Sequence, residues 1–445
     1  MHYHPLTATD KQEMLKEIGV GSFEDLLACV PSTLRNPKMS LPEALSEAEI
    51  QACFRDLGRR NENVITRLSF LGGGSYEHFI PAAVHSIVGR HEFYTAYTPY
   101  QAEASQGTLQ TIFEFQSLVT ELMGLDVSNA SHYDGATSMS EAVLMALRHT
   151  GRKKVLVARS VHPHYRQVLT TYLQGTEYSV QEIGFDDKGQ FDSTEFQQLL
   201  TDEVACAVFQ SPNFLGTIEN LEGIADKVHA RGALFILDVN PLSLGILRSP
   251  GEWNADIAVA EGQPLGIPLQ FGGPYLGLFA TTRALMRRMP GRVVGLTVDA
   301  QGRRAYCLTM QAREQHIRRE KASSNICSNQ ALCALAACAY MTLMGKQGIR
   351  EVGEINLDRS AYLRGRIAEL KGFKVNLSQP IFNEFFVTAE TAFSDIEKKL
   401  LADHILPGID LGKHYPEIKN SFLVCATETK SKKDLDRFVE MLAKC

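Results

Sequence analysis

Short apolar runs alternate with amphipathic segments through the middle of the chain. The apolar runs include KKVLVARS, VACAVFQS, ALFILDVN and ADIAVAEG, and the segments between them include PHYRQVLTTYL and NLEGIADKVHARG. A continuous apolar run is typical of a strand buried on both faces, and an amphipathic helix between two such strands makes a βαβ unit. We therefore predict that residues 66–330 form a large α/β domain around a mostly parallel sheet with helices on both faces.

The two ends of the chain have different patterns. Residues 1–65 are polar, and TATDKQEMLKEIGVGSFEDLLACVP predicts two short amphipathic helices that end at Gly19 and Pro31, so we expect an N-terminal helical arm. Residues 331–445 contain half-apolar strands and helices (KGFKVNLS, NEFFVTA, SFLVCAT, SKKDLDRFVEMLAK), which predict a smaller C-terminal α+β domain. Its first segment, ALCALAACAYMTLMG, is short for a membrane helix and is predicted to be a buried helix.

Net charge, cysteine content and the start of the sequence argue against several classes of function. The net charge is −6 and the basic residues are spread along the chain, so the sequence gives no sign of nucleic-acid binding. The nine cysteines form no CxxC pair, and their odd number indicates reduced thiols rather than a disulfide framework. The start of the sequence lacks the apolar core of a secretory signal. We expect a cytoplasmic protein that binds neither nucleic acid nor membrane.

One predicted helix, in SHYDGATSMSEAVLMALRHT, has features of an anion site. Ser138 and Glu141 are spaced as an S-x-x-E capping box, and Gly135 loosens the approach to the helix. A helix N-terminus with free N–H groups and the positive end of the helix dipole is suited to a phosphate. An ordinary capped helix without a ligand is the alternative.

Three further candidates follow apolar strands. His162 lies at a His-Pro step that opens a helix, at the carboxyl edge where open parallel sheets bind ligands. It either stacks on an aromatic ring or is a structural loop residue, and with His164 it lacks the further ligands that a metal needs. Asp238 ends a buried strand and needs a cationic partner, such as a pyridinium nitrogen, an arginine or a helix N-terminus. Gln263 follows the strand ADIAVAE in a glycine-rich loop.

This order of features matches enzymes that hold pyridoxal phosphate on a parallel sheet, but one part is missing. Such enzymes need a lysine a few dozen residues beyond the aspartate, whose amine forms a Schiff base with the cofactor. No lysine lies between Lys227 and Lys321, although this interval is rich in arginine, and a guanidinium cannot replace the amine. We therefore expect no covalent cofactor on this chain.

Five long stretches resemble the P-protein family of the glycine cleavage system, and in particular the α chain of its two-chain form, glycine decarboxylase. They are FLGGGSYEHFIPAAV, FYTAYTPYQAEASQGTLQTIFEFQSLVTELMGLDVSNAS, YDGATSMSEA, EGQPLGIPLQFGGPYLG and RREKASSNICSNQAL. The resemblance covers essentially the whole chain. It implies the pyridoxal-phosphate-dependent transferase fold of the aspartate-aminotransferase type. It also implies an α2β2 assembly whose β chain, an ancient duplicate, has the cofactor lysine at the position aligned with Gln263.

The resemblance implies a division of labour between the two chains. The β partner holds pyridoxal phosphate and decarboxylates glycine, and the aminomethyl group passes to the lipoyl arm of the H-protein. This chain, as a subunit of glycine dehydrogenase (aminomethyl-transferring), would shape the pocket of its partner. The residues of the loop TAYTPYQAEASQG that would reach that pocket are Tyr97, Tyr100 and Gln101. The residues that would remain as a remnant pocket on this chain are Ser138, His162, Asp238 and Gln263.

Other hypotheses remain open from the sequence. Tyr97, Tyr100 and Gln101 can be ordinary loop-packing residues. The chain can be an autonomous pyridoxal-phosphate enzyme, such as an amino-acid decarboxylase or a desulfurase, that uses a lysine elsewhere, for which Lys321 is a poor candidate because it lies in a predicted helix after the sheet. It can also be a purely structural or regulatory pseudoenzyme.

Overall fold

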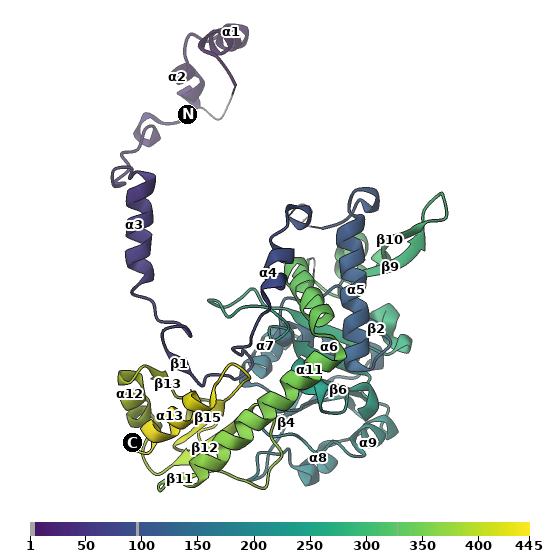
Figure 1. Cartoon of the computed structure of the whole chain (residues 1–445). Helices are drawn as coiled ribbons and strands as arrows, with labels where there is room; N and C mark the ends of the chain where they lie inside the picture. Colours follow the sequence, from purple (N-terminus) through teal and green to yellow (C-terminus); the bar gives the residue numbers. More distant parts are fainter. Residues whose placement is uncertain (1–4, 95–97, 327) are drawn as a thin grey trace. The chain divides into compact units, whose positions relative to one another are not determined.

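A computed structural model of the chain describes residues 5–94, 98–326 and 328–445, which divide into two units, Met1–Glu62 and Asn63–Cys445. The first unit contains the helices α1 (Ala8–Ile18), α2 (Phe23–Leu26) and α3 (Glu47–Gly58) (Figure 1). The first helix ends at Gly19 as predicted, because glycine adopts the left-handed conformation there (φ 85°). The second helix is a single turn that continues as a 3-10 turn toward Pro31.

The larger unit is built around a seven-stranded sheet with the order β2-β8-β7-β6-β5-β3-β4. Its strands are β2 (Val127–Ser128), β3 (Lys154–Ala158), β4 (Ser179–Ile183), β5 (Val204–Gln210), β6 (Leu234–Val239), β7 (Ile257–Glu261) and β8 (Gly277–Thr281). The five strands β3 to β7 are parallel to one another, and β8 is antiparallel to both of its neighbours. The mostly parallel sheet is thus confirmed. Strands β6 and β7 are buried along their whole length, as their continuous apolar sequences predict.

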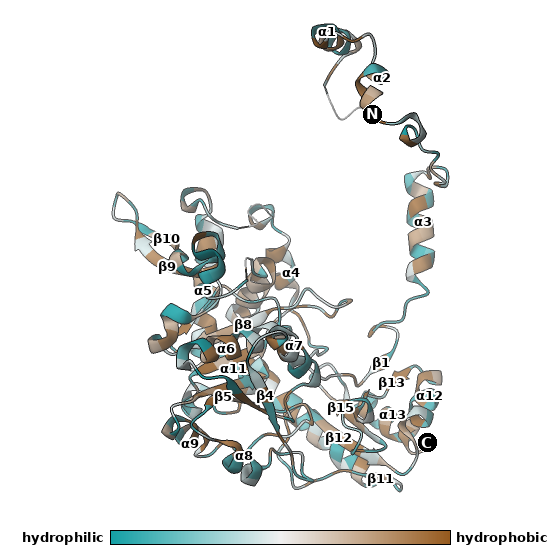
Figure 2. Ribbon diagram, turned by 180° about the vertical axis from the view of Figure 1, so that it is seen from behind, coloured by the Kyte–Doolittle hydropathy of each residue, from teal (hydrophilic) through white to brown (hydrophobic). Residues whose placement is uncertain are grey.

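Helices between the strands cover the sheet. They are α4 (Ala82–Val88), α5 (Gln106–Met123), α6 (Gly135–Thr150), α7 (Pro163–Leu173), α8 (Ser193–Leu199) and α9 (Ile224–Ala230). Helix α6 packs against α7 and against β7 and β8, and its inner side is almost entirely buried. In the hydropathy colours, β5 is largely hydrophobic and the edge strand β4 is hydrophilic (Figure 2), in agreement with their burial.

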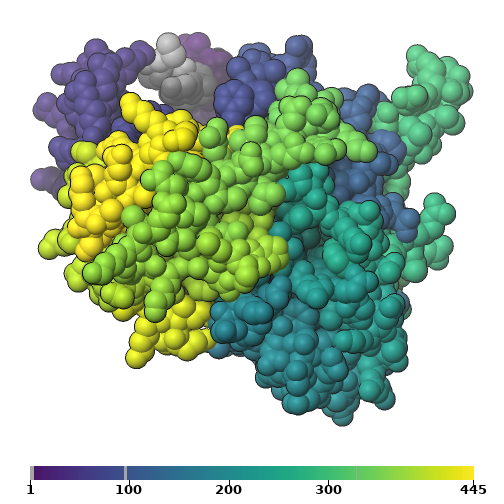
Figure 3. Space-filling model, turned by 60° about the horizontal axis from the view of Figure 1, so that its bottom comes forward, coloured from purple at the N-terminus to yellow at the C-terminus, as the bar shows by residue number. Residues whose placement is uncertain are grey.

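Helix α11 (Ala331–Ala368) connects the two parts of the larger unit. Its first half packs against α4 and α5, and its second half packs against the C-terminal elements β11, β12 and α13 (Figures 1 and 3). Gly345 interrupts the helix with a non-helical backbone (φ 59°, ψ −177°). Among the described residues it is the one helix long and apolar enough to cross a membrane, but half of its most apolar window is buried in the protein.

A four-stranded antiparallel sheet completes the C-terminal part. Its strands are β11 (Phe373–Lys374), β12 (Glu384–Ala389), β15 (Ser421–Cys425) and β14 (Ile409–Asp410), and its helices are α12 (Phe393–Ala402) and α13 (Lys432–Leu442). The start of the larger unit joins this part, because β1 (Leu68–Ser69) pairs with β13 (Ile405–Leu406). The sequence patterns did not indicate the hairpin of β9 (Val293–Val298) and β10 (Arg304–Thr309), which projects from the large sheet (Figure 1).

Candidate functional site

Four predicted residues gather around the carboxyl ends of the parallel strands. His162 follows β3, Asp238 lies near the end of β6, Gln263 follows β7, and Ser138 lies on α6, which packs against β7. All four are buried. Parallel strands present their carboxyl ends at one edge of the sheet, and this brings together residues that are far apart in the sequence.

The start of α6 differs from the prediction. The helix begins at Gly135, and the Asp134 carboxylate caps it by accepting a hydrogen bond from the Thr137 N–H (2.8 Å). Ser138 and Glu141 therefore lie inside the helix, and the predicted Ser138–Glu141 capping box is wrong. Aspartate is as good an N-cap residue as serine, so Asp134 starts the helix one turn earlier. Among the described residues, the Ser138 Oγ and the Glu141 Oε2 have no hydrogen-bond partner.

The N-terminus of α6 is occupied by a carboxylate of the chain itself. Glu261, the last residue of β7, accepts a hydrogen bond from the Gly135 N–H through Oε2 (2.9 Å). Its Oε1 accepts hydrogen bonds from the Gln263 N–H (2.9 Å) and the Leu276 N–H (3.0 Å). Burial raises the pKa of Glu261 to about 8, against the three N–H donors that lower it. The predicted phosphate position is thus filled by an internal acid.

His162 stacks on an aromatic ring, and that ring belongs to the chain. The imidazole lies 4.6 Å from the Tyr165 ring, centroid to centroid, at an interplanar angle of 18°. Its Nδ1 accepts a hydrogen bond from the His164 N–H (3.1 Å), which places the ring proton on Nε2, facing the Gly73 carbonyl (2.7 Å). Burial lowers the pKa of His162 to about 3, so the imidazole is neutral. Tyr165 is buried as well, and its hydroxyl lies so close to Gly135 that a Cβ there would collide with it.

Asp238 has no cation beside it among the described residues. Its side chain is buried, and its Oδ2 has no hydrogen-bond partner in the part of the chain that the structure describes. Burial, reinforced by the charge of Glu261, raises the pKa of Asp238 well above its usual value. This shift favours the neutral carboxyl group, which needs no cationic partner.

Gln263 is held by its amide and does not point into open space. Its Oε1 accepts a hydrogen bond from the Tyr76 N–H (2.8 Å), and its Nε2 donates to the Tyr76 carbonyl (2.9 Å) and the Ile267 carbonyl (2.8 Å). A lysine side chain has no acceptor for the Tyr76 N–H. At this position the amide thus ties two segments of the fold together.

These residues do not fit pyridoxal phosphate. Gln263 carries an amide, which cannot form a Schiff base and is held in three hydrogen bonds, and the helix N-terminus that would bind the phosphate is bonded to Glu261. One face of His162 is covered by Tyr165. Within the described part of the chain, no group of three or more His, Cys, Asp or Glu side chains is arranged to hold a metal ion.

The loop predicted to reach the pocket of the partner contacts Arg292 through Tyr100. Tyr97 is outside the described residues. The Tyr100 hydroxyl accepts a hydrogen bond from Arg292 Nη2 (3.0 Å), and the guanidinium lies 5.4 Å from the centre of the ring. Arg292 is buried and pairs with Glu314 (3.6 Å), whereas Tyr100 is 56% exposed. Gln101 is exposed and precedes a 3-10 turn without a side-chain cap. The buried guanidinium of Arg292 thus holds the exposed side chain of Tyr100 at the surface.

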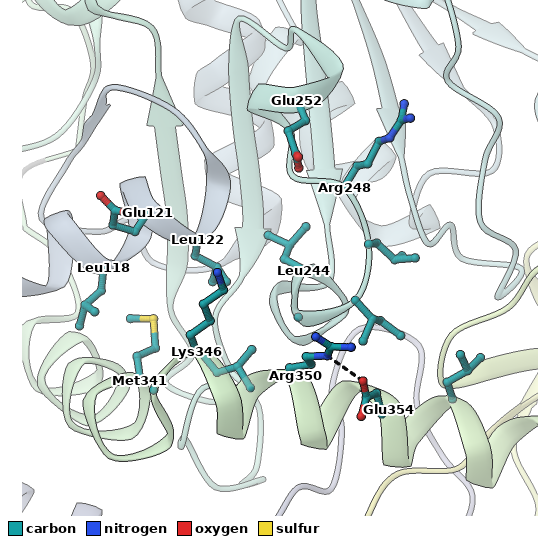
Figure 4. Close-up of a pocket in the computed structure, with 16 residues that line it drawn as sticks. Leu118, Glu121, Leu122, Leu244, Arg248, Glu252, Met341, Lys346, Arg350 and Glu354 are labelled. Carbon is teal, nitrogen blue, oxygen red and sulfur yellow. Dashed lines mark hydrogen bonds and ion pairs between the residues drawn. The ribbon is translucent and has the colours of Figure 1, made fainter.

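A separate cavity of about 960 Å³ lies between α5, α11 and the turn Pro241–Gly245 (Figure 4). Apolar side chains such as Leu122, Leu244 and Met341 line it, and charged side chains including the Arg350–Glu354 pair (2.8 Å) surround them. None of its lining residues belongs to the strand-end cluster, the group formed by Ser138, His162, Asp238 and Gln263.

Sequence reasoning missed Glu261, Tyr165 and Arg292. Glu261 had a signal, because it ends an apolar strand in the same way as Asp238. Tyr165 had none, since its place three residues after His162 on an amphipathic helix is typical of a core residue. Arg292 was one of many arginines in the lysine-free interval, and only the fold separates it from the others.

Comparison with known proteins is consistent with this fold. The family model of the glycine cleavage system P-protein matches residues 1–442. The chain is 47% identical to a probable glycine dehydrogenase (decarboxylating) subunit 1 of Geobacillus sp. strain WCH70, over 100% of this chain and 99% of that one. It is 49% identical to the protein of the same name from Desulfitobacterium hafniense, over 99% and 98% of the two chains.

Solved structures agree. A crystal structure of glycine decarboxylase (P-protein) in inhibitor-bound form superposes with a TM-score of 0.92 at 41% identity, over 100% of both chains. A bacterial sphingosine-1-phosphate lyase has a TM-score of 0.66 at 13% identity, over 93% of both chains, and shares the fold alone. The fold is that of the pyridoxal-phosphate-dependent transferases, as predicted. The chain belongs to the glycine cleavage system P-protein family, and within it to glycine dehydrogenase (decarboxylating) subunit 1.

Proposed function

We propose that this chain is the lysine-free α subunit of a two-chain glycine decarboxylase, active only with a β subunit that holds pyridoxal phosphate. The observation that carries the proposal is the amide of Gln263, which makes three hydrogen bonds and cannot form a Schiff base; the resemblance aligns this position with the cofactor lysine of the β chain. Relatives named "subunit 1" support a second subunit. In this proposal the assembly is α2β2, glycine is the substrate, and the aminomethyl group passes to the lipoyl arm of the H-protein.

Exposed apolar residues support a protein partner. Large apolar side chains lie on the surface of the glycine-rich loop and of the β9–β10 hairpin: Leu269, Phe271, Leu296 and Val298. Phe271 is 97% exposed. Within the arm taken by itself, the described helices α1, α2 and α3 bury no residue, although each carries hydrophobic positions (Figure 2). Such surfaces are typical of chains that become buried in an assembly.

The pocket contribution of this chain is proposed to come from the loop that contains Tyr97, Tyr100 and Gln101. Arg292 donates to the Tyr100 oxygen, so the phenol hydrogen is free to point to another acceptor. A phenol that is exposed, oriented and able to donate suits the wall of a site completed by another chain. The pyridoxal phosphate of the partner would supply the electron sink, while this loop would orient and shield the substrate.

The test is the exchange of glycine carboxyl carbon with bicarbonate in mixtures of the two chains. We expect no exchange with either chain alone and full activity with both. Activity of this chain alone, or a borohydride-trapped cofactor on one of its lysines, would show an autonomous enzyme. Full activity of the β chain without this chain would show a structural or regulatory pseudoenzyme.

The contribution of the loop is tested in the assembled complex. Tyr100→Phe removes the phenol hydrogen and keeps the ring, so we expect exchange to fall by about tenfold or more without loss of complex formation. Tyr97→Phe is tested in parallel. Tyr94→Phe, which changes another exposed tyrosine, is the control. Unchanged exchange in both Tyr97→Phe and Tyr100→Phe would contradict a role in the pocket of the partner.

The compartment is proposed to be the cytoplasm. The eight cysteines that the structure describes are free thiols. Free thiols in this number suit a reducing compartment.

A further inference from the structure

The strand-end cluster has three marks of a cofactor position. His162 is a neutral imidazole with a flat ring, Asp238 is a buried acid at the end of β6, and the N-terminus of α6 presents the Gly135 N–H. In a pyridoxal-phosphate enzyme these would contact the ring face, the ring nitrogen and the phosphate. In this chain each is adjacent to a side chain of the protein itself.

Tyr165 packs between His162 and the start of α6. It stacks on His162 at 4.6 Å, nearly parallel, and its hydroxyl reaches the start of α6 at Gly135. Asp238 and Glu261 are close enough to act electrostatically on its phenol. One aromatic ring thus lies against the histidine and the helix N-terminus.

Glu261 lies where a phosphate would be. Its carboxyl group accepts three backbone hydrogen bonds, from Gly135, Gln263 and Leu276. Three convergent N–H donors, one of them from a helix N-terminus, are a typical anion cradle. In this chain the Glu261 carboxyl group fills the cradle.

We propose that Tyr165 and Glu261 are built-in occupants of the cofactor position, with a phenol in place of the ring and a carboxyl group in place of the phosphate. They keep the strand ends, α6 and α7 in the geometry of a loaded site without any ligand. The chain is therefore stable and assembly-ready with no cofactor of its own. Removing each occupant should open a site for a small molecule of the matching class.

The ring position is tested with Tyr165→Ala in the full-length chain. We expect its melting temperature to fall by roughly 5 °C or more, because a large buried ring is lost. Added 4-methylphenol should restore several degrees in a saturable manner and leave the wild type unchanged. Tyr165→Phe keeps the ring and should melt near the wild type. Absence of any 4-methylphenol effect on Tyr165→Ala would overturn the ring assignment.

The anion position is tested with Glu261→Ala, which leaves the Gly135, Gln263 and Leu276 N–H groups without their acceptor. Acetate or formate should raise its melting temperature more than chloride at equal ionic strength. The matched control is Glu141→Ala, which removes a buried glutamate whose Oε2 bonds to nothing among the described residues. Equal acetate effects on both variants would overturn the anion assignment. If Tyr165→Ala does not fold, this comparison decides the proposal.

The double variant Tyr165→Ala/Glu261→Ala tests whether the two occupants together fill one cofactor position. It should bind pyridoxine 5′-phosphate, which has no aldehyde to react with surface lysines, at least about tenfold more tightly than pyridoxine. The control Tyr340→Ala/Glu141→Ala removes a buried tyrosine and a buried glutamate elsewhere and should bind neither. Failure of the double variant to prefer the phosphorylated compound would overturn the proposal. These readouts do not involve the partner chain, so they are independent of the proposed function.

Discussion

At the scale of single residues, a buried amide defines what this chain is able to do. Gln263 satisfies both backbone groups of Tyr76 and also bonds to Ile267. A lysine at this position would leave the Tyr76 N–H without an acceptor and bury an ammonium group. The residue is thus a structural connection between two segments of the fold.

We predict that Gln263→Lys does not create a cofactor-binding chain. The variant should lose about 1–3 kcal/mol of unfolding free energy, because a buried donor is left unsatisfied. Addition of pyridoxal phosphate should give no aldimine absorbance from this position, since Tyr165 and Glu261 remain in place. Spectra of the variant with cofactor, compared with Gln263→Ala, are the measurement. A strong visible band in Gln263→Lys alone would contradict this prediction.

A second prediction at this scale concerns Arg292. Because it donates to Tyr100 and pairs with Glu314, it acts through the phenol as a positioning residue. In the assembled complex, Arg292→Leu should reduce exchange, and Arg292→Lys should recover part of it. In the Tyr100→Phe background, where the phenol oxygen is already absent, Arg292→Leu should have a much smaller effect. Equal losses in both backgrounds would indicate a purely structural role.

At the scale of elements, the periodic patterns located most strands and helices, but not their ends. Helix α7 matches its predicted segment because His162 and Pro163 form a clear start. Helix α6 was placed one turn too late, since SHYDGATSMSE contains several residues that can cap a helix and the sequence does not rank them. The hairpin of β9 and β10 was missed because apolar and polar residues alternate only weakly along its strands and one side of it is exposed.

The corrected start of α6 gives a direct test. Asp134→Ala removes the cap on the Thr137 N–H and should cost about 1–2 kcal/mol of unfolding free energy. Ser138→Ala removes a hydroxyl that has no hydrogen-bond partner among the described residues, so it should change stability by less than about 0.5 kcal/mol. Urea unfolding of both variants is the measurement. A larger loss for Ser138→Ala than for Asp134→Ala would favour the predicted capping box.

At the scale of the whole molecule, the large unit contains several buried acids. Burial raises the pKa of Glu141, Glu219 and Glu384 to about 7 and that of Glu261 to about 8. An unfolded glutamate titrates near 4.3, so the folded chain binds more protons than the unfolded chain between about pH 4.5 and 8. Stability contributed by these groups is therefore present at the acidic end of this window and is lost as pH rises through it.

We predict that unfolding free energy falls between pH 5.5 and 8. Glu141 is expected to account for about 1–2 kcal/mol of this fall, because its Oε2 is buried without a partner among the described residues. Glu141→Gln cannot ionise, so it should flatten the profile by that amount, whereas Glu203→Gln at an exposed position should not. Urea unfolding across the pH range is the measurement. A profile that rises with pH would show that these groups are ionised in the folded state.

The sequence by itself determined the fold class and the family, because these depend on hydrophobic period and on local motifs. It also brought Ser138, His162, Asp238 and Gln263 forward as candidates, and the fold confirmed that they lie around one edge of the sheet. Only the tertiary structure decided what fills that edge. Glu261 is hydrogen-bonded to the N-terminus of α6, although the two are far apart in the sequence. Tyr165 stacks on His162 because of the direction in which α7 runs. Such contacts depend on packing between elements, which a sequence pattern does not specify.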